Sequence, residues 1–479
     1  MLSERALRCG ILSIVTWRTS LCVVFVILSC VQMCVAQLKR EAAPTLPADV
    51  KSYRLYQNEA QELLEDELTM FFPGCVNVKG GGFHEGRVDG KLPPRFVGGT
   101  LVFQSRMTWV AAEVALRRPD RAQAYLVYAR HGARFLQDVM WDKTNGGFYW
   151  AVDTYGKPAA PTGAIKHAYG MALAIQALAH VYAATGDEQY LKLAQDADQW
   201  LLSKGYDKKR GGYFQAFMPK GDIIVSAEET GEPKLKTDKI GTLYGCKSTM
   251  AHIHLLEAFD ELYRVSPNAE LRQRIRDMYD VTRDKAMLPT GMMGQNFLPT
   301  WTPLDRGGAF GLNLETGSVL LDTAKVLQID KEPRSLGVVQ KLVDTALERG
   351  WDDQLGGFWS TPDATDKTWR AQAEGARILL ALYARAGDDS ERYWTAFQKQ
   401  WHFITLYMTD RQSHGWFPTV DTAGRPTSRN MIQSIKACDQ TVRALMDVAD
   451  TLGVLAGDTP AMPATRPRPT TKPVATTQP

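Results

Sequence analysis

The sequence predicts an all-α protein folded as an (α/α)6 barrel, in which six helical hairpins form a closed ring of inner helices inside a ring of outer helices. Two observations lead to this fold class. A short motif of glycine followed by an aromatic residue recurs six times along the chain, and between successive motifs lie two helical stretches joined by a short break. A repeated unit of this kind buries its apolar surface by stacking on its neighbours.

The glycine-aromatic motifs are spaced about 60 to 80 residues apart, and the fourth is the weakest. We expect all six to form turns at one mouth of the barrel, because they stand at equivalent places in the repeat. Their aromatic side chains either shape a pocket there or plug the opening. In chain order the motifs are "GGGF" at 80–83, "GGFYW" at 146–150, "GGYF" at 211–214, "GMMGQNF" at 291–297, "GGFW" at 356–359 and "GWF" at 415–417.

Hydrophobic patterning distinguishes the two helices of each hairpin. The helix before each break is apolar on all sides, as in "YGMALAIQALAHVY" at 169–182, which indicates a helix covered on both faces. The helix after the break is amphipathic, as in "EQYLKLAQDADQWLLSK" at 188–204, and suits the outer ring. The expected helices span 49–70, 100–117, 119–139, 166–185, 188–204, 243–264, 268–287, 312–328, 335–349, 368–386, 390–408 and 432–453.

Residues 1–36 have the layout of a secretory signal. Three arginines precede an apolar run that then meets polar residues, and cleavage after Ala36 is expected. An uncleaved membrane anchor is the alternative, because the run is near the shortest length that spans a bilayer. We therefore expect a secreted or periplasmic protein, or one that is anchored to a membrane by this segment.

The other end of the chain, residues 456–479, is rich in proline and lacks large aromatic residues, which predicts a disordered tail. The barrel domain is therefore expected at 45–455. Of the 479 residues, 44% are hydrophobic and 23% are charged, which is ordinary globular composition. The net charge of +3 is too balanced to indicate nucleic acid as a partner. Three cysteines outside the N-terminal segment, widely spaced, fit neither a disulfide framework nor a metal site.

The stretch "KSTMAHIHLLEAFDELYR" at 247–264 raises the question of function. It is patterned as a helix with one apolar face, while Lys247, Met250, His254 and Glu257 recur on another face at steps of three and four. Such a stripe is either a solvated surface or a helix that directs a base and a carboxylate at a substrate.

Three segments together carry a family resemblance: "QSRMTWVAAEVA", "KSTMAHIHLLEAFDELYRV" and "DKTWRAQAEG". With the glycine-aromatic turns, they resemble the N-acylglucosamine 2-epimerase superfamily, in particular its cellobiose 2-epimerase branch, over about residues 50–450. The resemblance implies an (α/α)6 barrel with a sugar-sized pocket. It also implies epimerisation at C2, or the related aldose–ketose isomerisation, by proton transfer without a cofactor.

The resemblance assigns catalytic roles to Arg106, His254 and Glu257. Removal of the proton next to a sugar carbonyl needs a base and stabilisation of the enediolate oxygen. The family histidine and its carboxylate partner fall on His254 and Glu257, and the family arginine of the second helix falls on Arg106. The alternative for Arg106 is a structural ion pair, such as one with Glu113, and from the residues alone a structural pair on one helix is favoured for His254 with Glu257.

The sequence departs from the family at several positions. The opposing histidine of the family falls on Gln440, although Lys436 and Arg443 keep their places around it. The histidine usual in the fourth helix falls on Met171, and in the eighth helix a histidine is lost while Glu315 keeps a carboxylate. Glutamine and methionine do not exchange protons near pH 7. With a single base left, we expect ketose formation to exceed inversion at C2.

Substrate contacts are expected from further residues of the matched segments. Trp369 and Glu374 suit stacking on a sugar ring and binding of its hydroxyl groups, and a structural role explains them equally well. The turn aromatics and Trp301 pose the same alternative. The full set of expected substrate-binding residues is Trp109, Lys247, Glu315, Trp369, Glu374 and Gln440.

Three other histidines are less favoured for catalysis, although His84 and His414, beside glycine-aromatic turns, could supply a substitute acid. His252 shares the apolar face of its helix, so a packed core residue is favoured, and His84 and His414 lie in loops, where solvated side chains are usual. No metal-ligand motif, phosphate-binding glycine loop or Ser-His-Asp order is present in the sequence.

The leading hypothesis is therefore an exported isomerase or epimerase that acts on a mono- or oligosaccharide. A non-catalytic carbohydrate-binding relative is the second hypothesis. The third is a glycoside hydrolase or lyase on the same barrel, since Glu257, Glu315 and Glu374 all fall on helices expected in the inner ring, and a hydrolase needs two carboxylates.

Overall fold

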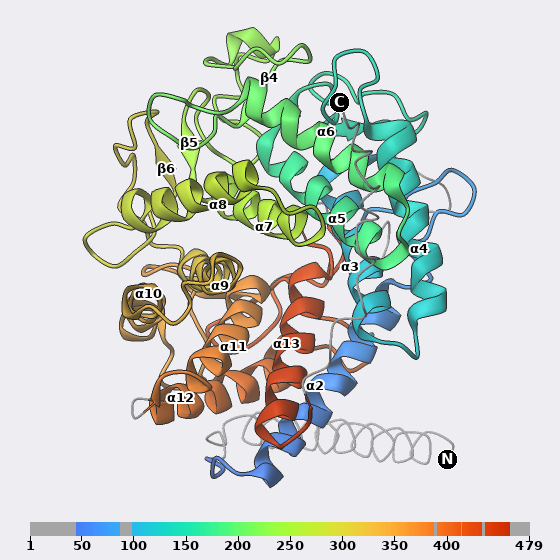
Figure 1. Cartoon of the computed structure of the whole chain (residues 1–479). Coiled ribbons are helices and arrows are strands. Elements are labelled where there is room, and N and C mark those ends of the chain that lie inside the picture. The colour runs from blue at the N-terminus through green and yellow to red at the C-terminus, as the bar shows by residue number, and fades with distance from the viewer. Residues whose placement is uncertain (1–44, 87–97, 388–389, 413, 434–435, 460–479) are drawn as a thin grey trace, which may run out of the picture. The chain divides into compact units, whose positions relative to one another are not determined.

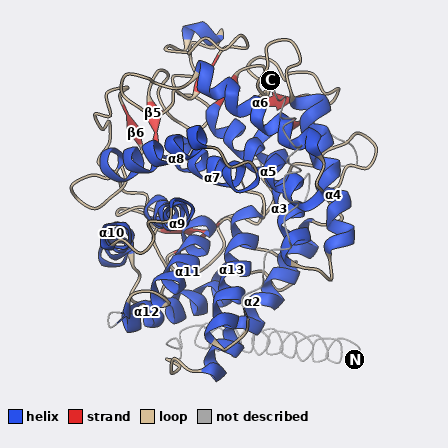
Figure 2. Cartoon of the chain, in the orientation of Figure 1, coloured by secondary structure: helices blue, strands red, loops and turns tan. Residues whose placement is uncertain are grey.

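Helices make up most of the described part of the chain (Figures 1 and 2). The computed structural model describes residues 45–86, 98–387, 390–412, 414–433 and 436–459. Within them lie twelve α-helices, which confirms the predicted all-α class. Their bounds are α2 (Val50–Phe71), α3 (Leu101–Arg117), α4 (Ala122–Phe135), α5 (Ala168–Thr185), α6 (Glu188–Lys204), α7 (Thr249–Val265), α8 (Ala269–Val281), α9 (Phe310–Leu327), α10 (Pro333–Gly350), α11 (Trp369–Tyr383), α12 (Ser390–Phe403) and α13 (Asp439–Leu455).

Alternate helices form a closed inner ring. Helices α3, α5, α7, α9, α11 and α13 pack each against the next, and α13 packs back onto α3. The remaining helices lie outside, each against an inner one: α4 on α3, α6 on α5, α8 on α7, α10 on α9, α12 on α11 and α2 on α13. This arrangement is the predicted (α/α)6 barrel.

The burial of each helix follows its sequence pattern. In α5 every residue from Ala168 to Ala183 is buried, because the helix touches neighbours on both sides and an outer helix behind. In α6 only one face is buried. The outer helices α4, α8 and α12 continue into single π-helical turns, Leu136–Met140, Thr282–Ala286 and Ile404–Met408, which brings their ends close to those that the sequence predicted.

The six glycine-aromatic motifs form turns that lead from an outer helix into the next inner helix, so they share the end of the barrel where the inner helices begin. In the second turn, Gly146 and Gly147 have φ angles of 68° and 73°, which residues with a side chain rarely adopt. The aromatic side chains of Phe148, Tyr213 and Phe358 are fully buried.

Short antiparallel strand pairs connect the turns. They are β1 (Gly99–Thr100) with β2 (Ala151–Val152), β3 (Lys166–His167) with β4 (Ala216–Phe217), β5 (Lys247–Ser248) with β6 (Asn296–Phe297), and β7 (Asp366–Thr368) with β8 (Thr419–Asp421). The predicted helix 243–264 therefore begins later than expected. Gly245 has a φ angle of 75°, Lys247 pairs with Phe297 across β5 and β6, and the side chain of Ser248 caps α7.

The two ends of the chain lie largely outside the residues that the structure describes. The predicted signal at 1–36 falls wholly on residues that the structure does not describe, and the predicted tail at 456–479 is described only as far as residue 459. There, Asp458 binds Arg54 at 2.6 Å, at the foot of α2. None of the described helices is long and apolar enough to cross a membrane.

Candidate active site

His254 and Glu257 form a hydrogen-bonded pair inside the inner ring. The two residues stand one turn apart on α7, so both side chains leave the same face of the helix. His254 Nδ1 lies 2.6 Å from Glu257 Oε2, and both residues are buried. His254 Nε2 has no hydrogen-bond partner among the described residues. The pair therefore presents one free imidazole nitrogen to the inside of the barrel.

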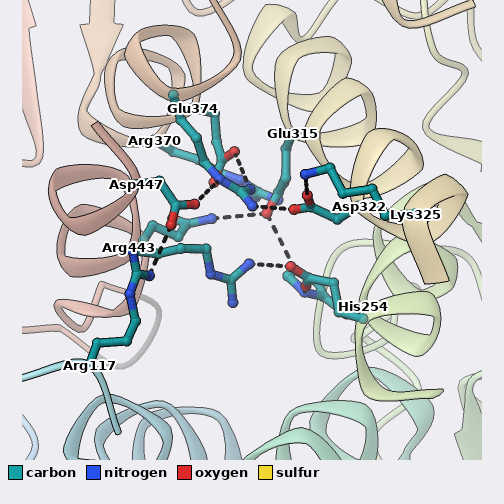
Figure 3. A network of polar contacts seen from close by, with 12 residues as sticks. Arg117, His254, Glu315, Asp322, Lys325, Arg370, Glu374, Arg443 and Asp447 are labelled. Carbon is teal, nitrogen blue, oxygen red and sulfur yellow. Dashed lines mark hydrogen bonds and ion pairs between the residues drawn. The ribbon is translucent and has the colours of Figure 1, made fainter. Parts of the chain in front are cut away.

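The second oxygen of Glu257 is held from across the ring by Arg443 of α13. Burial raises the pKa of the Glu257 carboxyl group, but Arg443 and the hydrogen bond from His254 lower it more, and its pKa ends well below the usual range. Figure 3 shows Arg443 and His254 within one network of polar contacts. Glu257 is thus a permanent anion that fixes the orientation of the imidazole.

Glu315 of α9 faces the free nitrogen of His254. Its Oε1 lies 3.7 Å from His254 Nε2 and accepts a hydrogen bond of 3.0 Å from Gln440 Nε2. Its Oε2 pairs with Arg370 of α11. Gln440 and His254 therefore approach the same carboxylate oxygen from different helices, and Gln440 stands where the second histidine of the resembled family was expected.

Arg106 of α3 is buried, and Tyr169 connects it to His254. Its Nη2 donates a hydrogen bond of 2.9 Å to the Tyr169 hydroxyl group, and the Tyr169 ring packs edge-on against His254 with 5.0 Å between ring centroids. Its ion-pair partner is Asp439, at 3.2 Å, and the alternative pairing with Glu113 is wrong. Glu113 instead binds Arg117 and His180 at the other end of the barrel.

Glu374 of α11 and Trp109 of α3 lie next to charged side chains inside the inner ring. Burial is the main cause that raises the pKa of Glu374 to about 7, although Arg377 lies 3.5 Å away and lowers it. The Trp109 ring stacks under the guanidinium of Arg443, 4.6 Å from its centroid. The predicted carboxylates and Trp109 are therefore all in the inner ring.

Lys247, which we predicted as a substrate contact, is engaged with protein groups in the structure. Lys247 is fully buried, and its ammonium group donates to Asp207 Oδ2 at 2.8 Å, to the Gly211 carbonyl at 2.7 Å and to the Pro299 carbonyl at 3.1 Å. Two of the three donors of the lysine hold the third glycine-aromatic turn, and the remaining donor binds the loop that follows the fourth motif. Its spacing from His254 suggested a shared helix face, but Lys247 lies in β5, before the helix begins.

The same lysine-to-turn contact recurs in the repeat. Lys166 binds Asp142 and the Gly146 carbonyl of the second turn, and Lys367 binds Asp352 and the Gly356 carbonyl of the fifth. Trp369 follows the latter lysine at the start of α11 and is half-buried. Its ring lies 5.9 Å from the Lys436 ammonium group.

A cavity of about 500 Å³ lies in the half of the inner ring where the helices end. Its lining includes Trp109, Glu257 and Arg443, whereas His254 and Arg106 are not among the lining residues. The cavity therefore does not lie at the mouth formed by the glycine-aromatic turns, as the sequence had suggested for a pocket.

Comparison with known proteins shows the family of this chain. The family model described as N-acylglucosamine 2-epimerase matches residues 81–436. The chain belongs to the N-acylglucosamine 2-epimerase family. The cellobiose 2-epimerase of Ruminococcus albus is 26% identical over 373 residues, which cover 76% of this chain and 90% of that protein. The D-mannose isomerase of Marinomonas mediterranea is 23% identical, with 81% and 96% covered.

A solved structure, the cellobiose 2-epimerase of Spirochaeta thermophila, agrees with the fold. It superposes with a TM-score of 0.72 at 26% identity and covers 85% of this chain and 98% of that one. Family membership and these relatives support sugar isomerase or epimerase activity for the chain. The resemblance seen in the sequence is thereby confirmed.

Several residues of this site were not predicted from the sequence. Tyr169, Arg370 and Asp439 contact predicted residues from other inner helices, and Arg377 contacts Glu374 on its own helix α11. Arginines usually lie at the surface, so nothing in composition marked Arg370 and Arg377 as half-buried residues of the inner ring. The available signal was spacing: Arg370 and Arg377 stand four and three residues from Glu374 on a helix expected in the inner ring.

His252 and His414 each have a protein partner in the structure. His252 is buried, where it accepts a hydrogen bond from the Tyr213 backbone N–H and bonds the Ser248 carbonyl, and burial lowers its pKa to about 4. His414 lies 2.6 Å from Asp66 and is partly exposed. Among the described residues, no group of three or more metal-ligating side chains comes together.

Proposed function

We propose that this protein is a sugar isomerase that moves a proton between C1 and C2 of an aldose, with His254 as the base. The hydrogen-bonded His254–Glu257 pair carries the proposal. Because Glu257 occupies Nδ1, the imidazole is held in one orientation, and Nε2 is the nitrogen that exchanges a proton with substrate.

The reaction needs only groups that the inner ring contains. His254 Nε2 takes the C2 proton of the open-chain aldose, and the electron pair of the broken C–H bond forms the C1–C2 double bond of an enediolate. Negative charge moves to the carbonyl oxygen, where Arg106 is the proposed stabilising cation. Transfer of the O2 proton to O1 and return of a proton from His254 Nε2 to C1 give the ketose, whereas return of that proton to C2 regenerates the aldose.

Gln440 is the reason to favour isomerisation over epimerisation. Inversion at C2 requires a proton donor on the opposite face of the enediolate, and the Gln440 amide neither donates nor accepts a proton near pH 7. Its Nε2 is engaged with Glu315. Relatives of this chain include both a D-mannose isomerase and cellobiose 2-epimerases, so the family supports either outcome.

The proposal is tested with D-mannose, D-glucose and cellobiose, whose products are separated and identified by ¹³C NMR. We expect a ketose as the main product from at least one of them, with the C2 epimer as the minor product. An excess of C2 epimer contradicts the single-base scheme. Release of new reducing ends from an oligosaccharide points to a hydrolase, and saturable sugar binding without turnover points to a non-catalytic relative; either result overturns the proposal.

We also propose export, which rests on the pattern of residues 1–36 alone. The test is N-terminal sequencing of the protein recovered from the exported fraction. A mature N-terminus at Gln37 supports cleavage after Ala36, whereas the intact N-terminus in a membrane fraction supports the anchor.

A further inference from the structure

The cavity at the end of the barrel away from the glycine-aromatic turns is built from all six inner helices. Each helix contributes residues from its middle to its C-terminal end: Trp109 of α3, His180 of α5, Asp260 of α7, Ser318 of α9, Ile378 of α11 and Asp447 of α13 are examples. A volume of about 500 Å³ lies within the range of small-molecule sites.

Three buried polar atoms of its lining residues have neither a hydrogen-bond nor an ion-pair partner among the described residues; His180 Nδ1 also lacks a hydrogen bond but lies 3.4 Å from Glu261 Oε2. The three are Trp109 Nε1, Asp260 Oδ1 and Ser318 Oγ, each from a different inner helix, and each residue is at most 4% exposed. A buried polar group without a partner costs free energy, so such groups are expected to meet a ligand or water. An indole donor, a hydroxyl group and a carboxyl oxygen without partners thus belong to residues that line one cavity.

The charged side chains of the wall are already paired with each other. Arg117 binds Glu113 and Asp447, and Arg377 binds Asp322 and Asp447. An ionic ligand would have to break such pairs, whereas a neutral ligand with several hydroxyl groups needs only the three atoms that lack partners. Apolar side chains such as Val319 and Ile378 suit the C–H faces of such a ligand.

The cavity lies on the opposite side of the catalytic pair from the proposed site of proton transfer. Glu257 and Arg443 line the cavity, and His254 directs Nδ1 at Glu257. The free Nε2 instead lies near Glu315, which stands one turn before Ser318 on α9. A ligand in the cavity is therefore separated from Nε2 by the Glu257–Arg443 ion pair.

We propose that this cavity is a second binding site, distinct from the site of proton transfer, for a neutral polyhydroxy ligand such as a sugar or a sugar alcohol of monosaccharide size. Trp109, Asp260 and Ser318 provide its hydrogen bonds. Its occupant contacts the Glu257 carboxylate from the side opposite to His254.

The test is calorimetric titration of the full-length protein with 1,5-anhydro-D-glucitol, a hexose analogue that cannot open to an aldehyde and is therefore not turned over. Ser318→Ala removes one of the three atoms, and loss of a neutral hydrogen bond weakens binding about 2- to 10-fold. Ser105→Ala is the matched control, because Ser105 is equally buried on α3 and its hydroxyl group is equally unpaired among the described residues, but it does not line the cavity.

Ala381→Phe serves as a second variant, since it fills the cavity from its wall without removing a polar group. We expect it to abolish the binding that Ser318→Ala weakens and Ser105→Ala leaves unchanged. Binding that is the same in all four proteins, or no saturable binding to the wild type, overturns the proposal. The readout does not depend on turnover, so this result is independent of whether the protein proves to be an isomerase.

Discussion

Replacement of Glu374 by glutamine is expected to stabilise the protein at alkaline pH and to leave its stability unchanged in acid. Glu374 is 1% exposed, and its Oε2 accepts no hydrogen bond from the described residues. The nearby Arg377 is shared with Asp322 and Asp447, which bind it more closely. Burial therefore dominates and raises the pKa of Glu374 from 4.5 to about 7.

The raised pKa fixes the sign of the effect. The folded state holds the proton of Glu374 more tightly than the unfolded state does, so folding loses stability as the pH rises from about 4.5 through about 7. A difference of about 2.5 pH units, at about 1.4 kcal/mol per unit, amounts to about 3 kcal/mol above pH 8. Glu374→Gln avoids that loss, because the amide does not ionise.

Urea denaturation at pH 5, 6, 7 and 8, followed by tryptophan fluorescence, measures this difference. We expect the variant to gain up to about 3 kcal/mol over the wild type at pH 8 and almost nothing at pH 5. Glu348→Gln, at an exposed position of α10, is the control and should show no such trend. A Glu374→Gln protein that is less stable than the wild type at pH 8 would mean that the ion pair with Arg377 outweighs burial.

Three further substitutions test the roles of Lys247, Glu257 and Gln440. Lys247→Met should destabilise the fold by about 3 kcal/mol in urea denaturation, because it leaves Asp207 with a buried charge. The KM of the folded protein should stay unchanged. A raised KM without loss of stability would instead identify Lys247 as a substrate ligand. Glu257→Gln should lower kcat roughly 10²-fold with the fold intact by circular dichroism, and an unchanged kcat would remove Glu257 from the mechanism. Gln440→His should raise the ratio of C2 epimer to ketose in product analysis, and a constant ratio would show that this position does not face the enediolate.

The fold was predictable because it is repeated. Six equivalent motifs and the alternating helix patterns each indicated the same architecture, so an error at a single helix boundary did not change the predicted fold. The errors that remain have local causes. The start of α7 was missed because Lys247 continues a helical spacing, although Gly245 and the cap at Ser248 place the helix start at Thr249.

The site was predictable only where its residues are neighbours in the sequence. His254 and Glu257 lie one helical turn apart, so spacing alone suggested the pair that the structure contains. The partner of Arg106 was misassigned to Glu113 on the same helix, since Asp439 reaches it from the other end of the chain. Contacts that close the ring between the first and last inner helices have no signature in a single sequence.

Exchange of solvent deuterium into C2 of the sugar is the most direct test of His254 as the base. In D2O, an enzyme that removes the C2 proton to His254 Nε2 incorporates deuterium at C2 of the recovered aldose, which mass spectrometry detects even when little product forms. We predict exchange with the wild type and a loss of about 10²- to 10⁴-fold in His254→Ala, which is the range for removal of a general base. Exchange by His254→Ala at the wild-type rate, in a protein whose unfolding is unchanged, would contradict the account.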